Sequence, residues 1–212
     1  MKFAFISTAL LSCGMATAAP AIDGWYLSAF GGYSYFTSNL SLYRADVLLS
    51  DVRYRNGYNI GGRVGFQSNP IRYEFEYTYL SANPDRLRVN YIRQPTVTGN
   101  INVNALMANI YIDFPEFLEA ISPFVGVGIG YSFLNANIDS AGPLAVTFFN
   151  ASDNAFTYQG TAGLTYNFSE NYAINAAYRY MATSSNNTFG KNLQVQMGSA
   201  GIVYRFDQPC YK

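Results

Sequence analysis

"IRYEFEYTY", residues 71–79, alternates strictly between two kinds of side chain. The odd positions carry Ile or an aromatic residue, and the even positions carry Arg, Glu or Thr. This period of two predicts a β-strand whose two faces meet different surroundings. A soluble barrel, apolar inside, and a membrane barrel, apolar outside, share this period. The rest of the chain must therefore decide which face meets water.

Similar alternation recurs along the chain and predicts eight strands. The connections between them alternate between long and short, beginning with a long gap at 37–56 and a short one at 68–70. An even number of strands joined in this way is typical of an up-and-down barrel in an outer membrane. The predicted strands lie at 25–36, 57–67, 71–81, 103–114, 124–134, 156–168, 172–182 and 194–206.

The second face of most predicted strands carries small or amide side chains, which suit a narrow lumen. A face exposed to water would be expected to carry many Lys and Glu, and the predicted strands contain no Lys. Only 12% of the residues are charged, about half of the ~25% usual in a soluble domain. Aromatic residues such as Tyr79 and Phe168 close the predicted strands at both rims, as the girdles of a barrel in lipid do. The apolar faces are therefore predicted to meet lipid.

The first residues have the features of an export signal, with Lys2 before an apolar run at 3–11 and an Ala-x-Ala pattern at 16–18. Lipidation of Cys13 is the rival interpretation, which the good cleavage site after Ala18 disfavours. Cleavage leaves Cys210 as the only cysteine, so no internal disulfide is expected. The predicted organisation is a signal peptide at 1–18, the barrel at 19–206 and a short C-terminal tail at 207–212.

The last predicted strand, 194–206, and the stretch "PFVGVGIGY" at 123–131 resemble strands of a known family. This family comprises the small eight-stranded outer-membrane barrels of the OmpA, OmpX and opacity-protein type. The resemblance implies that the barrel assembly machinery reads a signal in the last strand. Family members commonly end on the closing aromatic residue, whereas residues 207–212 follow it here. The residues that match the assembly signal are Ser199, Gly201, Ile202, Tyr204 and Phe206.

Seven charged residues fall on the face that is predicted to line the lumen. An even-length turn centred between residues 69 and 70 places Arg63 opposite Glu76 and Gln67 opposite Arg72. Charges enclosed in this way must pair or remain hydrated. We therefore expect a paired network that plugs the interior, rather than a selective pore. The predicted network consists of Arg63, Arg72, Glu74, Glu76, Asp113, Arg179 and Arg205.

The composition argues against several classes of function. The sequence contains no histidine, which excludes hydrolases of the Ser-His and Asp-His types. Glu74 and Glu76 are better explained as partners of arginine, and no Cys or His cluster offers a metal site. The 13 basic and 13 acidic residues cancel, so no nucleic-acid partner is expected. We predict a protein that is not an enzyme and that holds no cofactor.

The long connections are predicted to carry the function. Those at 37–56 and 82–102 are mildly basic and would contact anionic partners, either lipopolysaccharide or a host surface ligand. Ordinary solvated loops without a ligand are an equal alternative. In the third, 135–155, the apolar centre at 144–149 would extend the hairpin or present an adhesive edge. The predicted contact residues are Arg44, Arg53, Arg55, Arg86, Arg88 and Arg93.

Together these observations predict an all-β fold, an eight-stranded antiparallel up-and-down transmembrane β-barrel in the bacterial outer membrane. Four long loops would be extracellular, and the short turns and both termini periplasmic. Its expected partners are outer-membrane lipid, lipopolysaccharide, the barrel assembly machinery and a host surface ligand. We expect a structural or adhesive role at the cell surface. A narrow channel for ions or small solutes is the first alternative, and an exported soluble barrel that binds an apolar ligand is the second.

Overall fold

The computed structural model describes most of the chain as β-strands. The described residues are 23–37, 40–44, 47–89, 92–93, 96–115, 120–141, 146–184 and 192–206. The predicted signal peptide and C-terminal tail lie outside them. The strands are β1 (Gly24–Phe36), β2 (Leu40–Arg44), β3 (Val47–Ser68), β4 (Ile71–Val89), β5 (Ile92–Arg93), β6 (Thr96–Asp113), β7 (Ile121–Ala141), β8 (Val146–Asn167), β9 (Tyr172–Thr183) and β10 (Gln194–Arg205).

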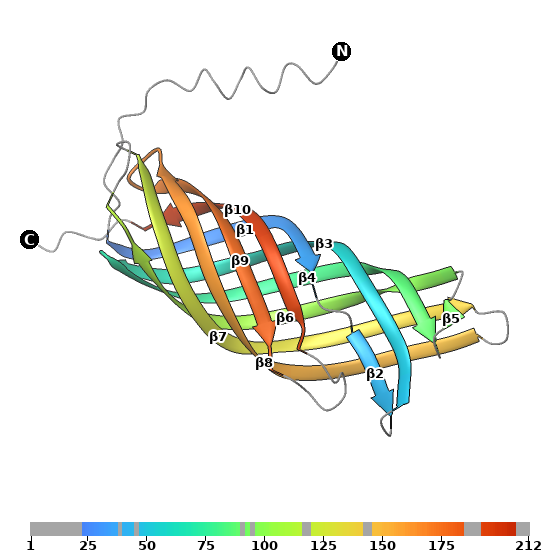
Figure 1. Ribbon diagram of the computed structural model, residues 1–212. Helices are drawn as coiled ribbons and strands as arrows, with labels where there is room; N and C mark the ends of the chain where they lie inside the picture. The colour runs from blue at the N-terminus through green and yellow to red at the C-terminus, as the bar shows by residue number, and fades with distance from the viewer. Residues whose placement is uncertain are drawn as a thin grey trace, which may run out of the picture.

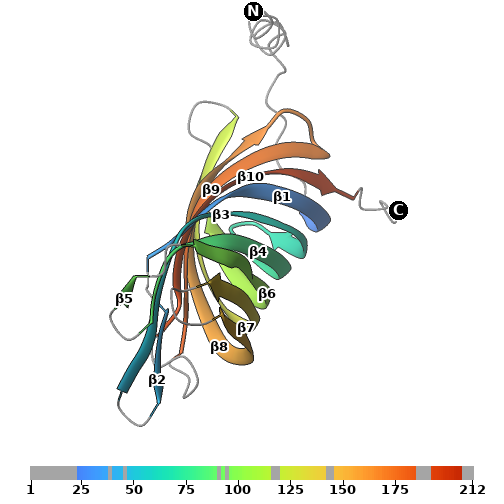
Figure 2. The same ribbon diagram turned by 90° about the vertical axis from the view of Figure 1, so that its right-hand side faces the viewer.

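Eight of the ten described strands close into one antiparallel barrel in which each strand pairs with its neighbours along the chain (Figure 1). The barrel closes where β1 pairs with β10, with Tyr26 opposite Arg205. The short strands β2 and β5 only add to the edges of β3 and β4 at the far end of the barrel (Figure 2). The predicted fold is confirmed. No helix among the described residues is long and apolar enough to cross a membrane.

The two ends of the barrel differ. Strand β1 begins, and β10 ends, at the end that carries the short turns, which we call the turn end. The turn between β3 and β4 gives the expected register, with Arg63 opposite Glu76 and Gln67 opposite Arg72. The opposite end, from which the long hairpins project, is called the loop end.

At the loop end the strands continue much further than the sequence indicated. Strand β3 begins at Val47 rather than at residue 57, and β7 and β8 stay paired as far as Ala141 opposite Val146. The predicted long loops are therefore largely paired hairpins, and the expected extension of the third one is confirmed. Outside a membrane neither face of a hairpin needs to be apolar, so paired strands there need not alternate between apolar and polar residues. The strands therefore continue beyond the point where the alternation in the sequence ends.

The outer surface of the barrel is apolar and is ordered by depth. Its middle belt is mainly aliphatic, with Val127 and Ile202 69% and 62% exposed, and Phe75 of β4 is an aromatic residue within it. Aromatic side chains lie on the outside toward both ends, for example Trp25 at the turn end and Tyr35 at the loop end. This is the surface of a barrel in lipid, because a barrel in water would expose this continuous band of large apolar side chains to solvent, which soluble proteins avoid. The soluble-barrel alternative is therefore wrong.

The interior is not polar throughout. An apolar cluster occupies much of its loop-end half, beside buried polar residues such as Ser34, Ser132 and Thr157, although the sequence indicated mainly small and amide residues on this face. We call it the apolar plug. It consists of Phe36, Leu80, Ala82, Ile101, Val103, Ala105, Met107, Leu134, Ala155, Met181, Leu193, Val195 and Met197.

Candidate functional site

The middle of the lumen is built around Glu76 on β4. Its two carboxylate oxygens are bound by arginines of different strands. The Nε of Arg63 on β3 donates to Oε2 at 2.7 Å, and the Nη1 of Arg179 on β9 donates to Oε1 at 2.6 Å. The hydroxyl of Thr78 also donates to Oε1 at 2.7 Å. Glu76 is 0% exposed, so this carboxylate is held entirely by the protein.

The two arginines that share Glu76 also lie over one ring. The guanidinium carbons of Arg63 and Arg179 lie 4.1 and 4.4 Å from the centroid of Phe30 on β1. The Nη2 of Arg179 donates to the amide oxygen of Asn59 at 3.2 Å. The face of an aromatic ring attracts cations. Phe30 therefore helps two positive charges to share one carboxylate.

A second layer lies nearer the turn end, around Arg72. Its Nη1 lies 3.5 Å from Glu74 Oε1, and its Nη2 lies 3.2 Å from Asp113 Oδ1. The hydroxyl of Tyr26 donates to Glu74 Oε1. The other oxygen of Glu74 lies 3.5 Å from Arg63 Nε, which joins this layer to the first. Six of the seven predicted lumen charges thus form one continuous network across β3, β4, β6 and β9.

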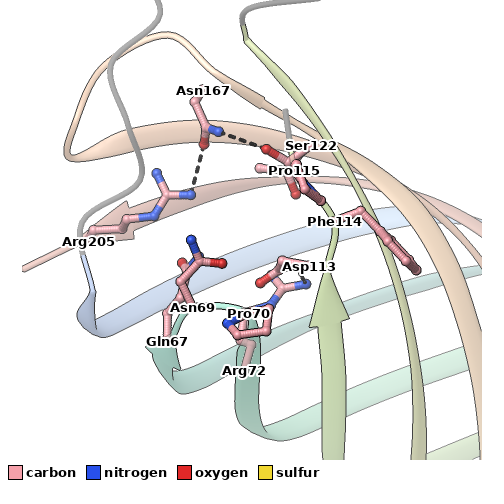
Figure 3. Close-up of a pocket in the computed structure, with 11 residues that line it drawn as sticks. Gln67, Asn69, Pro70, Arg72, Asp113, Phe114, Pro115, Ser122, Asn167 and Arg205 are labelled. Atoms are coloured by element: carbon pink, nitrogen blue, oxygen red, sulfur yellow. Dashed lines mark hydrogen bonds and ion pairs between the residues drawn. The ribbon is translucent and has the colours of Figure 1, made fainter. Parts of the chain in front are cut away.

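The seventh, Arg205, lies at the turn end. Its Nη2 donates to the amide oxygen of Asn167 at 2.9 Å. Arg205 borders a cavity of about 260 Å³, which Arg72 and Asp113 also line (Figure 3). Arg205 belongs to the inside of the barrel, as the sequence indicated, but it lies apart from the pairs around Glu76.

Four buried rings complete the interior, and the sequence analysis missed them. Each lies directly across from a glycine of the neighbouring strand. A Cβ atom at any of these glycines would lie closer than 3.0 Å to the ring. Each glycine therefore makes room for the ring, and such cross-strand pairs are a signal that could have located the rings. The pairs are Tyr26 with Gly65, Phe30 with Gly61, Tyr111 with Gly126, and Phe124 with Gly163.

The predicted assembly signal lies on β10 and on the residue after it. Ser199 and Gly201 face the lumen, whereas Ile202, Tyr204 and Phe206 are exposed on the outer surface. Tyr204 packs against the ring of Phe206, with centroids 5.2 Å apart. An apolar outer edge and a small inner face therefore coincide in this last strand.

The six predicted loop arginines belong to the hairpins at the loop end, where their side chains lie outside what the structure describes. The backbone register nevertheless places several of them on neighbouring strands. Arg53 on β3 pairs with Arg86 on β4, and Arg88 on β4 pairs with Arg93 on β5 and, on its other side, with Asp51. Arg44 is the last residue of β2, and Arg55 lies in a register shift of β3.

Comparison with known proteins agrees with this architecture. An uncharacterized protein of Brucella suis is 22% identical, over 82% of this chain and 73% of its own length. The crystal structure of Neisserial surface protein A matches 86% of this chain and 97% of its own, with 18% identity and a TM-score of 0.58. Outer membrane protein OprG from Pseudomonas aeruginosa matches 89% and 99%, with 12% identity and a TM-score of 0.58. These solved structures share the fold.

The family assignment covers nearly the whole chain. The model of the outer membrane protein beta-barrel domain matches residues 5–206, which include every described strand. Together with the closed barrel and its apolar outer surface, this match shows that the chain belongs to the outer membrane protein beta-barrel family.

Proposed function

We propose that this protein is a non-enzymatic surface protein of the bacterial outer membrane whose loop-end hairpins bind anionic groups outside the membrane. The long hairpins project from the cell, and the short turns face the periplasm. The lumen serves as a rigid support and conducts no ions. The observation that carries the proposal is the pairing of arginines on neighbouring strands beyond the membrane belt.

The arginine pairs favour an anionic ligand. Arg53 and Arg86 occupy directly paired positions, as do Arg88 and Arg93. Like charges at paired positions destabilise a sheet. Asp51 opposite Arg88 compensates only part of this charge. An anion bound across these strands would relieve the repulsion and gain charge-assisted hydrogen bonds.

The position of the pairs favours a ligand outside the membrane. Arg53 precedes Tyr58, a ring exposed on the outer surface near the loop end, by five residues along β3. A strand rises about 3.3 Å per residue, so the Arg53–Arg86 pair lies on the order of 16 Å beyond Tyr58, away from the membrane. The sugar and phosphate groups of lipopolysaccharide, or an anionic host surface, could be reached at this height.

The interior supports a closed barrel rather than the channel alternative. An ion that entered from the turn end would meet the network around Glu76, whose oxygens are held by two arginines. It would then have to cross the apolar plug, whose side chains are at most 4% exposed. A bare ion in an apolar environment is strongly disfavoured. The proposed role therefore lies on the surface of the hairpins.

Two matched variants test the proposal. Arg53→Gln with Arg86→Gln removes one arginine pair, whereas Arg44→Gln with Arg55→Gln removes the same charge from positions that do not face another arginine in the register. Binding of each protein, held in nanodiscs, is measured on lipopolysaccharide and on cultured host cells. We expect the first variant to lose binding about tenfold and to lose its salt dependence.

The two arms identify the source of the anion. Loss of binding to lipopolysaccharide alone would assign the ligand to the protein's own membrane, and loss on host cells alone would assign an adhesive role. Equal loss of binding in both arginine variants would show that only the net charge of the hairpins matters, and it would contradict a site formed by the paired arginines. Unchanged binding in the first variant would contradict the proposal.

A further inference from the structure

The turn end of the lumen contains a cavity of about 260 Å³, bordered by strands from opposite sides of the barrel. Figure 3 shows Arg205 of β10 and Asn167 of β8 on one side, with Arg72 of β4 and Asp113 of β6 across from them. This volume is slightly below the range of about 300–1,000 Å³ for drug-sized ligands. The cavity is therefore large enough for a small ion or molecule with its water.

Polar groups that line the cavity have no hydrogen-bond partner among the described residues. They include the hydroxyl of Thr165 on β8, a residue that is 5% exposed, and the Nε of Arg72, which is also 5% exposed. A buried polar group without a partner is costly, so native proteins satisfy it with water or a ligand. Both groups donate hydrogen bonds, whereas the unpartnered Oδ2 of Asp113, which also lines the cavity, accepts them. Donors outnumber this acceptor, so the cavity favours a guest that mainly accepts hydrogen bonds.

The charge of the lining indicates whether the guest is an anion or a cation. Two guanidinium groups, of Arg72 and Arg205, and one carboxylate, of Asp113, border the cavity. The other two carboxylates of the network, of Glu74 and Glu76, do not line the cavity. Glu74 contacts Arg63 and also Arg72, so it offsets part of the Arg72 charge, and Glu76 contacts Arg63 and Arg179. The lining therefore has an excess of positive charge. Guanidinium groups match the planar oxygens of carboxylate and phosphate.

We infer that the turn-end cavity is a binding site for a small oxyanion of the carboxylate or phosphate type. Arg205 and Arg72 supply the charge, and the Thr165 hydroxyl donates a further hydrogen bond. The apolar plug closes the loop-end half of the lumen. The ligand therefore enters and leaves at the turn end, either as a soluble anion or as the head group of a lipid at the rim.

The test follows the Nε–H signals of arginine by NMR in the folded, full-length protein. Inorganic phosphate or acetate is titrated at constant ionic strength in lipid-free detergent. We expect a saturable shift of the Arg72 and Arg205 signals and none for Arg179, which lies in the network around Glu76. A shift that appears only in nanodiscs with phosphatidylglycerol would assign the anion to a lipid head group.

Two threonine variants on β8 separate binding from general effects. Thr165→Val removes the hydroxyl that lines the cavity. Thr161→Val removes another buried hydroxyl without a described partner, two inward positions away and outside the lining. We expect Thr165→Val to weaken phosphate binding about tenfold and Thr161→Val to leave it unchanged.

Arg205→Gln supplies a further check, because Arg205 lies across the cavity from Arg72 and its loss should abolish the saturable shift at Arg72. Equal effects of the two threonine variants would overturn the inference, because the hydroxyl in the lining would then have no special role. The absence of a saturable shift with phosphate, acetate and phosphatidylglycerol would overturn it as well. Because the cavity lies inside the barrel at the turn end, the outcome of this test does not depend on whether the loop-end arginines bind an anion.

Discussion

Arg179 on β9 reaches across the lumen and donates through Nη1 to Oε1 of Glu76 on β4, at 2.6 Å. Both residues are 0% exposed. They are 103 residues apart in the chain, so this contact requires β4 and β9 to face each other across the lumen. Arg63 holds the other oxygen of the same carboxylate from the neighbouring strand. Glu76 is therefore the centre of the polar interior, and its charge is needed by two cations.

Removal of the Glu76 charge should destabilise the barrel strongly. Glu76→Gln leaves two arginines facing a neutral group, and breaking a buried ion pair from one side costs about 3–5 kcal/mol. The midpoint of urea unfolding in detergent measures this loss. Glu170 is exposed in the connection between β8 and β9, and Glu170→Gln should change the stability by less than about 0.5 kcal/mol. Equal stability of the two variants would show that Glu76 is not an essential partner.

The glycines that face the interior rings should tolerate no side chain. A Cβ at Gly126 would lie closer than 3.0 Å both to the ring of Tyr111 and to the carbonyl oxygen of Ile110. Gly126→Ala should therefore cost about 1–3 kcal/mol, as overpacking does. Gly160 faces outward and has nothing within 4 Å of an added Cβ, so Gly160→Ala should be neutral or slightly stabilising. Thermal unfolding, read from the shift in gel mobility, distinguishes the two.

These glycines also show what the sequence could and could not predict. In 71–79 one face is polar and the other apolar, so Glu74 and Glu76 could be assigned to the lumen by alternation alone. At residues 25–30 of β1 both faces carry large apolar side chains, and alternation does not distinguish them. Tyr26 becomes an interior residue only when the register places it against Gly65. That register depends on pairing with another strand, which no local pattern contains.

The loop-end half was missed for a related reason. Met107 and Met181 belong to the apolar plug, and each has an apolar or aromatic neighbour on the opposite face of its strand. Alternation in hydropathy disappears where both faces are apolar, so the plug is not visible in the sequence. The hairpins beyond it have the opposite problem, because both of their faces tolerate polar residues. Tertiary contacts, rather than local preference, determine these parts.

Charge on the outer belt should be penalised according to depth. Val127 lies in the aliphatic belt and is 69% exposed. Val127→Arg should cost about 2–4 kcal/mol, because the charge enters the middle of the hydrocarbon layer. Tyr35 lies near the loop end, where the same change, Tyr35→Arg, should cost only about 0–1 kcal/mol. Folding into lipid vesicles across a urea series measures both costs, and equal values would contradict the proposed depth of the barrel.

Conductance should depend on the charged network and on the apolar plug together. Planar bilayers that contain the unmodified protein should show no ion current. Arg63→Ala with Glu76→Ala opens the charged layer, but the apolar plug remains and ions still cannot pass. Adding Met107→Ala and Met181→Ala to this variant removes side chains from the plug, and single-channel steps should then appear. Steps in the first double variant would mean that the charged network alone closes the barrel, and steps in the unmodified protein would establish the channel alternative.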